Sequence, residues 1–184
     1  MGDLAGMDIR RAPIEELRQA RGWSKPERDF WADEAAMWAR FTAVWEGLDD
    51  AAWLEPVAKS EAGGPDWSFL DHVAHLAAWQ EMAVDYIGRA ADTGVWPTDE
   101  EVVGGDFDRF NEDQRAEWAG RSPEEVRAWA VVSRERLLPV ARTVPLETIR
   151  GEDAWGWVFM SLHGHQLDHL GMLEPWLARR RVAS

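Results

Sequence analysis

Five histidines carry the clearest chemical signal in this 184-residue sequence, and all of them lie in two short windows. His72 and His75 form the first window, and His163, His165 and His169 form the second. His165 and His169 are four residues apart, so a helix would place both imidazoles on one face, one turn apart. Such a pair can reach one metal ion, with a third ligand from the other window. Three imidazoles leave a coordination position open for water or substrate, as in catalytic zinc sites.

Imidazole nitrogens bind several divalent metals, zinc, nickel and iron among them, so the sequence does not select one. A histidine on an apolar helix face is more often a packed residue with one satisfied hydrogen bond. A core network of histidines is therefore the main alternative to a metal site. The sequence contains no cysteine, which excludes disulfides, thiolate ligands and a cysteine nucleophile.

Apolar residues at helical spacing predict the elements that would carry these histidines. Four long helices are predicted, over residues 26–47, 67–91, 123–142 and 154–180. A shorter amphipathic segment is predicted over 106–119, and the Gly and Pro residues of 92–105 are typical of a loop. No alternating strand pattern is visible. The predicted fold class is therefore all-α, a four-helix bundle with an N-terminal extension.

Local signals predict where these helices begin and end. Asp66 or Ser68 can cap the second helix, and Ser122 begins a capping-box sequence for the third. Pro175 should kink the last helix or end it near Gly171. Residues 1–23 hold a short amphipathic piece that could be an extra helix or a partly ordered arm, and residues 24–184 form the predicted bundle domain.

Composition limits the possible partners. The formal net charge of −14 repels phosphate backbones and anionic membrane surfaces, so we expect neither nucleic acid nor a membrane as a partner. The N-terminus lacks the apolar core of a signal peptide. The absence of cysteine fits a reducing, cytoplasmic location. The 13 tryptophans suggest a bulky core or an aromatic pocket for a small-molecule substrate. A homodimer is plausible, because bundle faces often pair.

Both histidine windows resemble the DinB-like superfamily. Residues 67–80 read WSFLDHVAHLAAWQ, similar to the superfamily pattern W-[ST]-x-x-[DE] followed by H-[LIV]-x-x-[WY]. Residues 165–170 read HQLDHL, similar to H-x-x-[DE]-H-L. Residues 106–112 and 121–126 also resemble the DfsB/ClbS-like branch of the superfamily. The resemblance implies a DinB/YfiT-like four-helix bundle that binds a divalent metal.

The resemblance also implies roles for the histidines. It assigns His75, His165 and His169 as metal ligands. His75 is preferred to His72 because it is followed by Leu76 and, four residues after the histidine, by Trp79. His72 would then either contact and orient a metal-binding histidine or be a packed residue of the core. His163 is two residues before His165, so we expect it on a solvated face.

Other residues near the motifs are candidates for the site. Asn111, Arg115 and Trp79 are predicted to line the substrate pocket, with Arg115 able to bind an anionic group. A surface position is the commoner fate of an arginine, and a core position that of a tryptophan. Asp168 could orient a neighbouring imidazole or form an exposed salt bridge.

The resemblance implies a metal-dependent enzyme that acts on a small reactive electrophile. In the ClbS-like branch this means hydrolysis of a strained ring, for detoxification or self-resistance. The first alternative is transfer of a low-molecular-weight thiol, such as mycothiol or bacillithiol, and the second is a non-catalytic bundle that binds a small molecule. A cysteine-free protein could handle an electrophile without offering it a thiol of its own.

Overall fold

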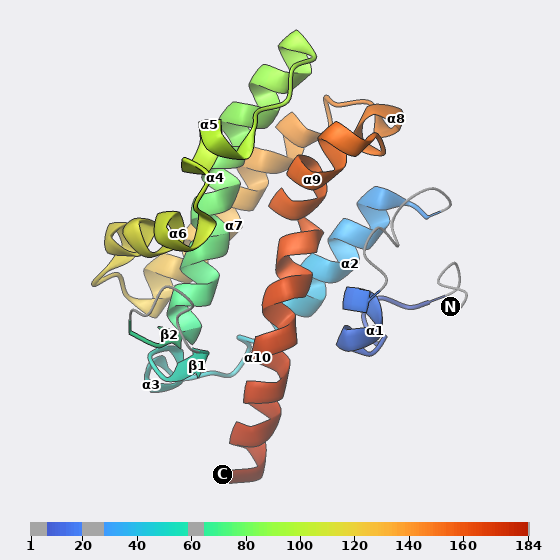
Figure 1. Cartoon of the computed structure of the whole chain (residues 1–184). Coiled ribbons are helices and arrows are strands. Elements are labelled where there is room, and N and C mark those ends of the chain that lie inside the picture. The colour runs from blue at the N-terminus through green and yellow to red at the C-terminus, as the bar shows by residue number, and fades with distance from the viewer. Residues whose placement is uncertain (1–6, 20–27, 59–64, 184) are drawn as a thin grey trace. The chain divides into compact units, whose positions relative to one another are not determined.

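The structure is a computed structural model that describes residues 7–19, 28–58 and 65–183. The described part is mostly helical, which confirms the all-α prediction. The chain divides into two compact units, one formed by Met1–Gly47 with Leu162–Ser184 and the other by Leu48–Ser161. The long helices are α2 (Phe30–Ala43), α4 (Phe69–Thr93), α7 (Pro123–Ala141) and α10 (His163–Ala183) (Figure 1).

Helix α4 is the centre of the Leu48–Ser161 unit. It packs along α7, and it also contacts α9 (Glu152–Ser161) and α6 (Phe107–Arg115). All residues from 69 to 80 are buried, so the first half of α4 is covered on every side. Ser68 caps the helix, because its Oγ accepts a hydrogen bond from the Asp71 N–H and the Asp71 carboxylate accepts one from the Ser68 N–H. The predicted cap at Ser122 of α7 is confirmed in the same way.

Short elements connect these helices, and sequence patterns missed most of them. A two-stranded antiparallel pair joins β1 (Pro56–Ala58) and β2 (Trp67–Ser68), which are too short to show alternation. The predicted loop over 92–105 contains the one-turn helix α5 (Asp99–Val103), which Thr98 caps. The remaining short elements are α3 (Asp50–Trp53), the 3₁₀ turn Ala116–Trp118 and α8 (Leu146–Ile149).

The other unit, Met1–Gly47 with Leu162–Ser184, is built around α2 and α10, which pack against each other. Asp29 caps α2 by accepting hydrogen bonds from the N–H groups of the second and third residues after it. The predicted start of this helix at residue 26 lies outside the described residues. The predicted end at residue 47 is too late, because Gly47 has a φ of +76°, outside the helical region.

The N-terminal extension forms a helix, α1 (Ile14–Gln19), which packs on α10. Leu17 of α1 and Ile9 before it are buried, and both favour this docking. Arg40 of α2 stabilises the docked extension by donating hydrogen bonds to the carbonyl oxygens of Ile9 (2.9 Å) and Ala12 (2.7 Å). Of the two alternatives for this piece of sequence, the extra helix is therefore the one that forms.

The last predicted helix differs from the structure in two ways. Residues 154–180 belong to two helices instead of one, because α9 ends at Ser161 and α10 begins at His163. Pro175 does not end α10, which continues to Ala183. The Pro costs one backbone hydrogen bond, but Trp176 and Leu177 beyond it are buried, and Glu174 before it forms a two-bond ion pair with Arg40. These contacts favour continuation of the helix. Among the described residues, no helix is long and apolar enough to cross a membrane.

Candidate functional site

The paired histidines of the second window lie on one face of α10. His165 and His169 are one helical turn apart, and their ring centroids are 4.9 Å apart. His169 is buried and His165 is partly exposed. The pair therefore has the arrangement that the spacing predicted, with two imidazoles side by side and one of them reachable from solvent.

In the other unit, His75 of α4 is enclosed by tryptophan rings. The centroid of its imidazole is 5.1 Å from that of Trp67, 6.2 Å from that of Trp79 and 6.5 Å from that of Trp118. The planes cross at 78°, 73° and 67°, so each contact is edge-to-face. These rings leave the side chain of His75 buried and restrict the orientations that its imidazole can adopt.

Each of the three indoles is held by a hydrogen bond from its own N–H. Trp67 donates to Glu112 Oε1 (2.8 Å), and Trp79 donates to Asn111 Oδ1 (3.0 Å). Trp118 donates to Asp71 Oδ1 (3.0 Å). Two of the acceptors belong to α6, so this short helix holds two of the three rings around His75, those of Trp67 and Trp79.

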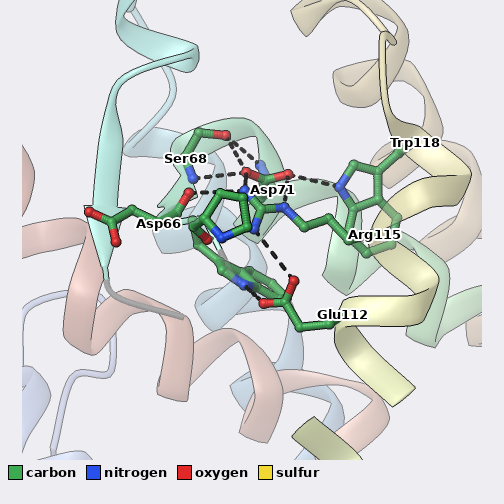
Figure 2. A network of polar contacts seen from close by, with 8 residues as sticks. Asp66, Ser68, Asp71, Glu112, Arg115 and Trp118 are labelled. Carbon is green, nitrogen blue, oxygen red and sulfur yellow. Dashed lines mark hydrogen bonds and ion pairs between the residues drawn. The ribbon is translucent and has the colours of Figure 1, made fainter. Parts of the chain in front are cut away.

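Asp71 is the centre of the polar network shown in Figure 2. Its carboxylate accepts hydrogen bonds from the Ser68 N–H (2.9 Å) and hydroxyl (2.7 Å), and from the Arg115 guanidinium at 2.9 and 3.2 Å. Burial raises the pKa of Asp71, but the bonds from Ser68, Trp118 and Arg115 together outweigh burial and lower the pKa overall. Asp71 is therefore ionised at neutral pH and forms a stable ion pair with Arg115.

Arg115 binds acceptors of the protein itself with its other donors. Nη1 donates to the Pro65 carbonyl (2.7 Å) and Nη2 to the Asp66 carbonyl (2.9 Å), while Nη1 also lies 3.6 Å from Glu112 Oε2. The guanidinium thus joins the segment before α4 to α6. A direct role of Arg115 in substrate binding stays a prediction.

A family model supplies the identification. The model of the DinB superfamily matches residues 35–173, more than half of the chain. The chain belongs to the DinB superfamily. Comparisons with curated proteins and with solved structures found no match. The predicted superfamily and its helical-bundle fold are confirmed, while membership of the DfsB/ClbS-like branch stays a prediction.

The matched region of this DinB-superfamily chain contains a suitable set of metal ligands. His75, His165 and His169 each offer one ring nitrogen, and together they could hold a metal ion. Neutral nitrogen donors of this kind fit a divalent transition metal or zinc, whereas the absence of thiolates disfavours a purely structural cysteine-type site. The donor chemistry therefore fits the metal that the superfamily resemblance implied.

The other two histidines of the DinB chain are buried. His72 lies 5.6 Å from the ring of Trp67, and burial lowers its pKa to about 4. His163 is fully buried against Phe30, with ring centroids 4.6 Å apart, and burial lowers its pKa to about 3. The predicted solvated position of His163 is wrong, because α10 begins at this residue and its first turn packs on the first turn of α2. Both side chains are neutral at pH 7.

Asp168 lies on α10 beside Arg18 of α1. The Arg18 Nε and the Asp168 Oδ1 are 3.8 Å apart, and both side chains are partly exposed. The contact is that of a salt-bridging acid, and a role of Asp168 in orienting an imidazole stays a prediction.

Sequence reasoning gave no role at the site to Asp71, Glu112 or Trp118, and it placed Trp67 in the core or in the substrate pocket. Trp67, Asp71 and Trp118 surround or support His75, and Glu112 holds one of the rings. Trp67 and Asp71 stand inside the recognised motif, and that position was the only available signal for them. Nothing in the local sequence indicates that α6 would place Glu112 against the start of α4.

Proposed function

We propose that this DinB-superfamily protein is a metal-dependent enzyme that hydrolyses small reactive electrophiles, in detoxification or self-resistance. The observation that carries the proposal is the pair His165 and His169 on one face of α10, with ring centroids 4.9 Å apart. With His75 as the third donor, the chain offers a set of nitrogens suited to one divalent ion.

Three residues would hold the ion, namely His75, His165 and His169. A bound divalent ion supplies Lewis acidity and lowers the pKa of a nucleophile toward neutrality. Three protein ligands leave room for a further group, which a catalytic site requires. The partial exposure of His165 gives this side of the pair access to solvent.

The chain's own residues favour a cation and a weakly polar substrate. His72 and His163 are kept neutral by burial, so they add no positive charge to the histidine windows. The indole N–H groups of Trp67, Trp79 and Trp118 are all bound to acceptors, so these rings present mainly apolar faces around His75. Such faces exclude water from the ligand, which strengthens its electrostatic interactions.

The absence of cysteine fits work on electrophiles. A thiol near a reactive substrate would be alkylated, and this sequence contains none. The same argument applies whether water or a small thiol attacks the substrate. The experiment therefore has to separate the two nucleophiles.

Metal analysis of protein purified without a histidine tag tests the ligand set. We expect close to one equivalent of zinc, nickel or iron, and loss of that metal in His169→Ala with unchanged far-UV circular dichroism. His72→Leu is the matched control, because it removes a buried histidine outside the proposed set and should keep the metal. Equal metal content in both variants, or none in the parent protein after addition of zinc and nickel, would refute the metal site.

Activity is then measured on a strained-ring electrophile such as an epoxide. We expect a hydrolysis product whose rate of formation does not depend on added thiol. A rate that requires thiol would assign the transferase activity instead. Recovery of unchanged but bound electrophile would assign a binding protein.

A further inference from the structure

Helix α6 covers the face of α4 that carries His75. Asp71, His75 and Trp79 follow one another along α4 at intervals of four residues, so they lie on one helix face. Asn111 of α6 bonds to Trp79, whereas Arg115 and Trp118 bond to Asp71. The segment 111–118 therefore runs antiparallel to 71–79 and crosses over His75.

Polar bonds attach α6 to α4 more than burial does. None of the residues of α6, all of which the structure describes, is fully buried. The helix contacts α4 through the bonds of Asn111 and Arg115, and through Phe107 and Phe110, which pack on Trp79. Glu112 bonds to Trp67 of β2, just before α4 begins. A helix held in this way contributes little to the apolar core, so its polar residues have another effect on the site.

We propose that α6 positions His75 as a metal ligand, with Asn111 and Glu112 acting through the rings of Trp79 and Trp67. This inference rests on the proposed function. A free histidine side chain rotates about two bonds, and binding a metal then costs the entropy of fixing it. Three anchored rings in edge-to-face contact fix the imidazole before the metal arrives, which raises the affinity.

The need to satisfy buried indole N–H groups does not explain these bonds fully. Trp67 is only partly buried, and its acceptor Glu112 is partly exposed, so water could serve the same donor. The bond to Glu112 instead fixes the direction of the ring, which lies 5.1 Å from His75. Asn111 fixes a second ring, that of Trp79, whose centroid is 6.2 Å from that of His75.

Paired substitutions on the full chain test this role. Asn111→Leu and Glu112→Leu remove the acceptors, whereas Asn111→Asp and Glu112→Gln keep an acceptor oxygen at the same place. Ser133→Ala is the matched control, because it removes a buried hydrogen bond to Gln80 of α4 without touching an indole. The readouts are zinc affinity by chelator competition, thermal unfolding of the metal-free protein, and the ring nitrogen resonances of His75 in the metal-free protein.

We expect the two leucine variants to bind zinc about tenfold to 100-fold more weakly, the range found when groups that orient metal-bound histidines are removed. The Asp and Gln variants and Ser133→Ala should stay within about threefold of the parent on the same scale. The His75 ring signals should be single and sharp in the parent, and shifted or broadened in the leucine variants. Unchanged zinc affinity and unchanged His75 signals in both leucine variants would overturn the inference.

The two proposals fail differently. If the parent protein binds no zinc, the proposed function fails, but the His75 resonances of the metal-free protein still report whether α6 orients the ring. If zinc binds equally well with and without the Asn111 and Glu112 acceptors, and the His75 signals do not change, the metal site stands and the positioning role falls.

Discussion

Replacement of Arg115 by methionine tests the polar network at the start of α4. Methionine keeps much of the length and apolar volume of the side chain but removes every donor. The variant loses two hydrogen bonds to the Asp71 carboxylate and two to the carbonyl oxygens of Pro65 and Asp66. It also leaves Asp71 ionised in a largely buried position, with Ser68 and Trp118 as its remaining donors among the residues that Figure 2 draws.

The expected magnitude follows from the exposure of the pair. Removal of one partner of a fully buried ion pair costs about 3–5 kcal/mol, whereas an exposed pair contributes about 0–1 kcal/mol. The side chains of Arg115 and Asp71 are 18% and 11% exposed, which places the pair near the buried end. The bonds that Asp71 keeps reduce the cost. We therefore expect Arg115→Met to lower the free energy of unfolding by about 3 kcal/mol.

Urea unfolding followed by far-UV circular dichroism measures this loss, because 13 tryptophans make fluorescence insensitive to one site. The matched control is Arg109→Met on the same helix. Its pair with Asp113 has an N···O distance of 3.8 Å and side-chain exposures of 80% and 73%. This control should change stability by no more than about 0.5 kcal/mol. Asp71→Asn and the double variant complete a cycle that isolates the coupling of the pair.

Acid titration adds a second check on the same residue. The pKa of Asp71 is lower in the folded chain than its ordinary value of 3.8, so its contribution to stability is present above that pH and is lost as the pH falls through the folded-state pKa. Arg115→Met should shrink this acid-dependent part. Arg115→Met and Arg109→Met variants of equal stability, with the same acid profile, would refute the reasoning about the network.

Three further predictions concern other parts of the chain. The pKa of His72 is lowered to about 4 from 6.5, so between these values the unfolded chain binds more protons than the folded chain, and this residue lowers stability by about 1.4 kcal/mol per pH unit as the pH falls. When metal-free protein is unfolded in urea at pH 7 and pH 5, His72→Leu should lose this share of the slope, while the similar share of the buried His163 remains. Arg40→Met removes the ion pair with Glu174 and two hydrogen bonds to the N-terminal segment, and should lower the free energy of unfolding by about 2–4 kcal/mol. It should also speed proteolysis before α2, and unchanged proteolysis would show that the N-terminal segment docks without Arg40. Asp29→Ala removes the cap of α2 and should lower the free energy of unfolding, measured in urea, by about 1 kcal/mol. Asp29→Ser keeps a capping oxygen and should retain most of the stabilisation by the cap.

Local patterns were sufficient to predict the long helices and several of their ends. Ser68 and Ser122 cap helices where predicted, because a capping box depends on residues three positions apart and needs no distant partner. The four-residue spacing of His165 and His169 sets their common face by helix geometry alone. The same local reasoning failed at Pro175, where burial of the following residues outweighs the cost of the Pro.

The sequence by itself thus determined the helical class, the superfamily and the histidines with donor chemistry, since each depends on residue type and short-range spacing. Only tertiary structure decided what surrounds those histidines. The burial of His163 depends on Phe30, which is 133 residues away in the chain. The positions of the tryptophan rings around His75 depend on α6, which lies more than 30 residues after His75 in the sequence. Contacts between such distant residues follow from how the helices pack, and no local periodicity encodes them.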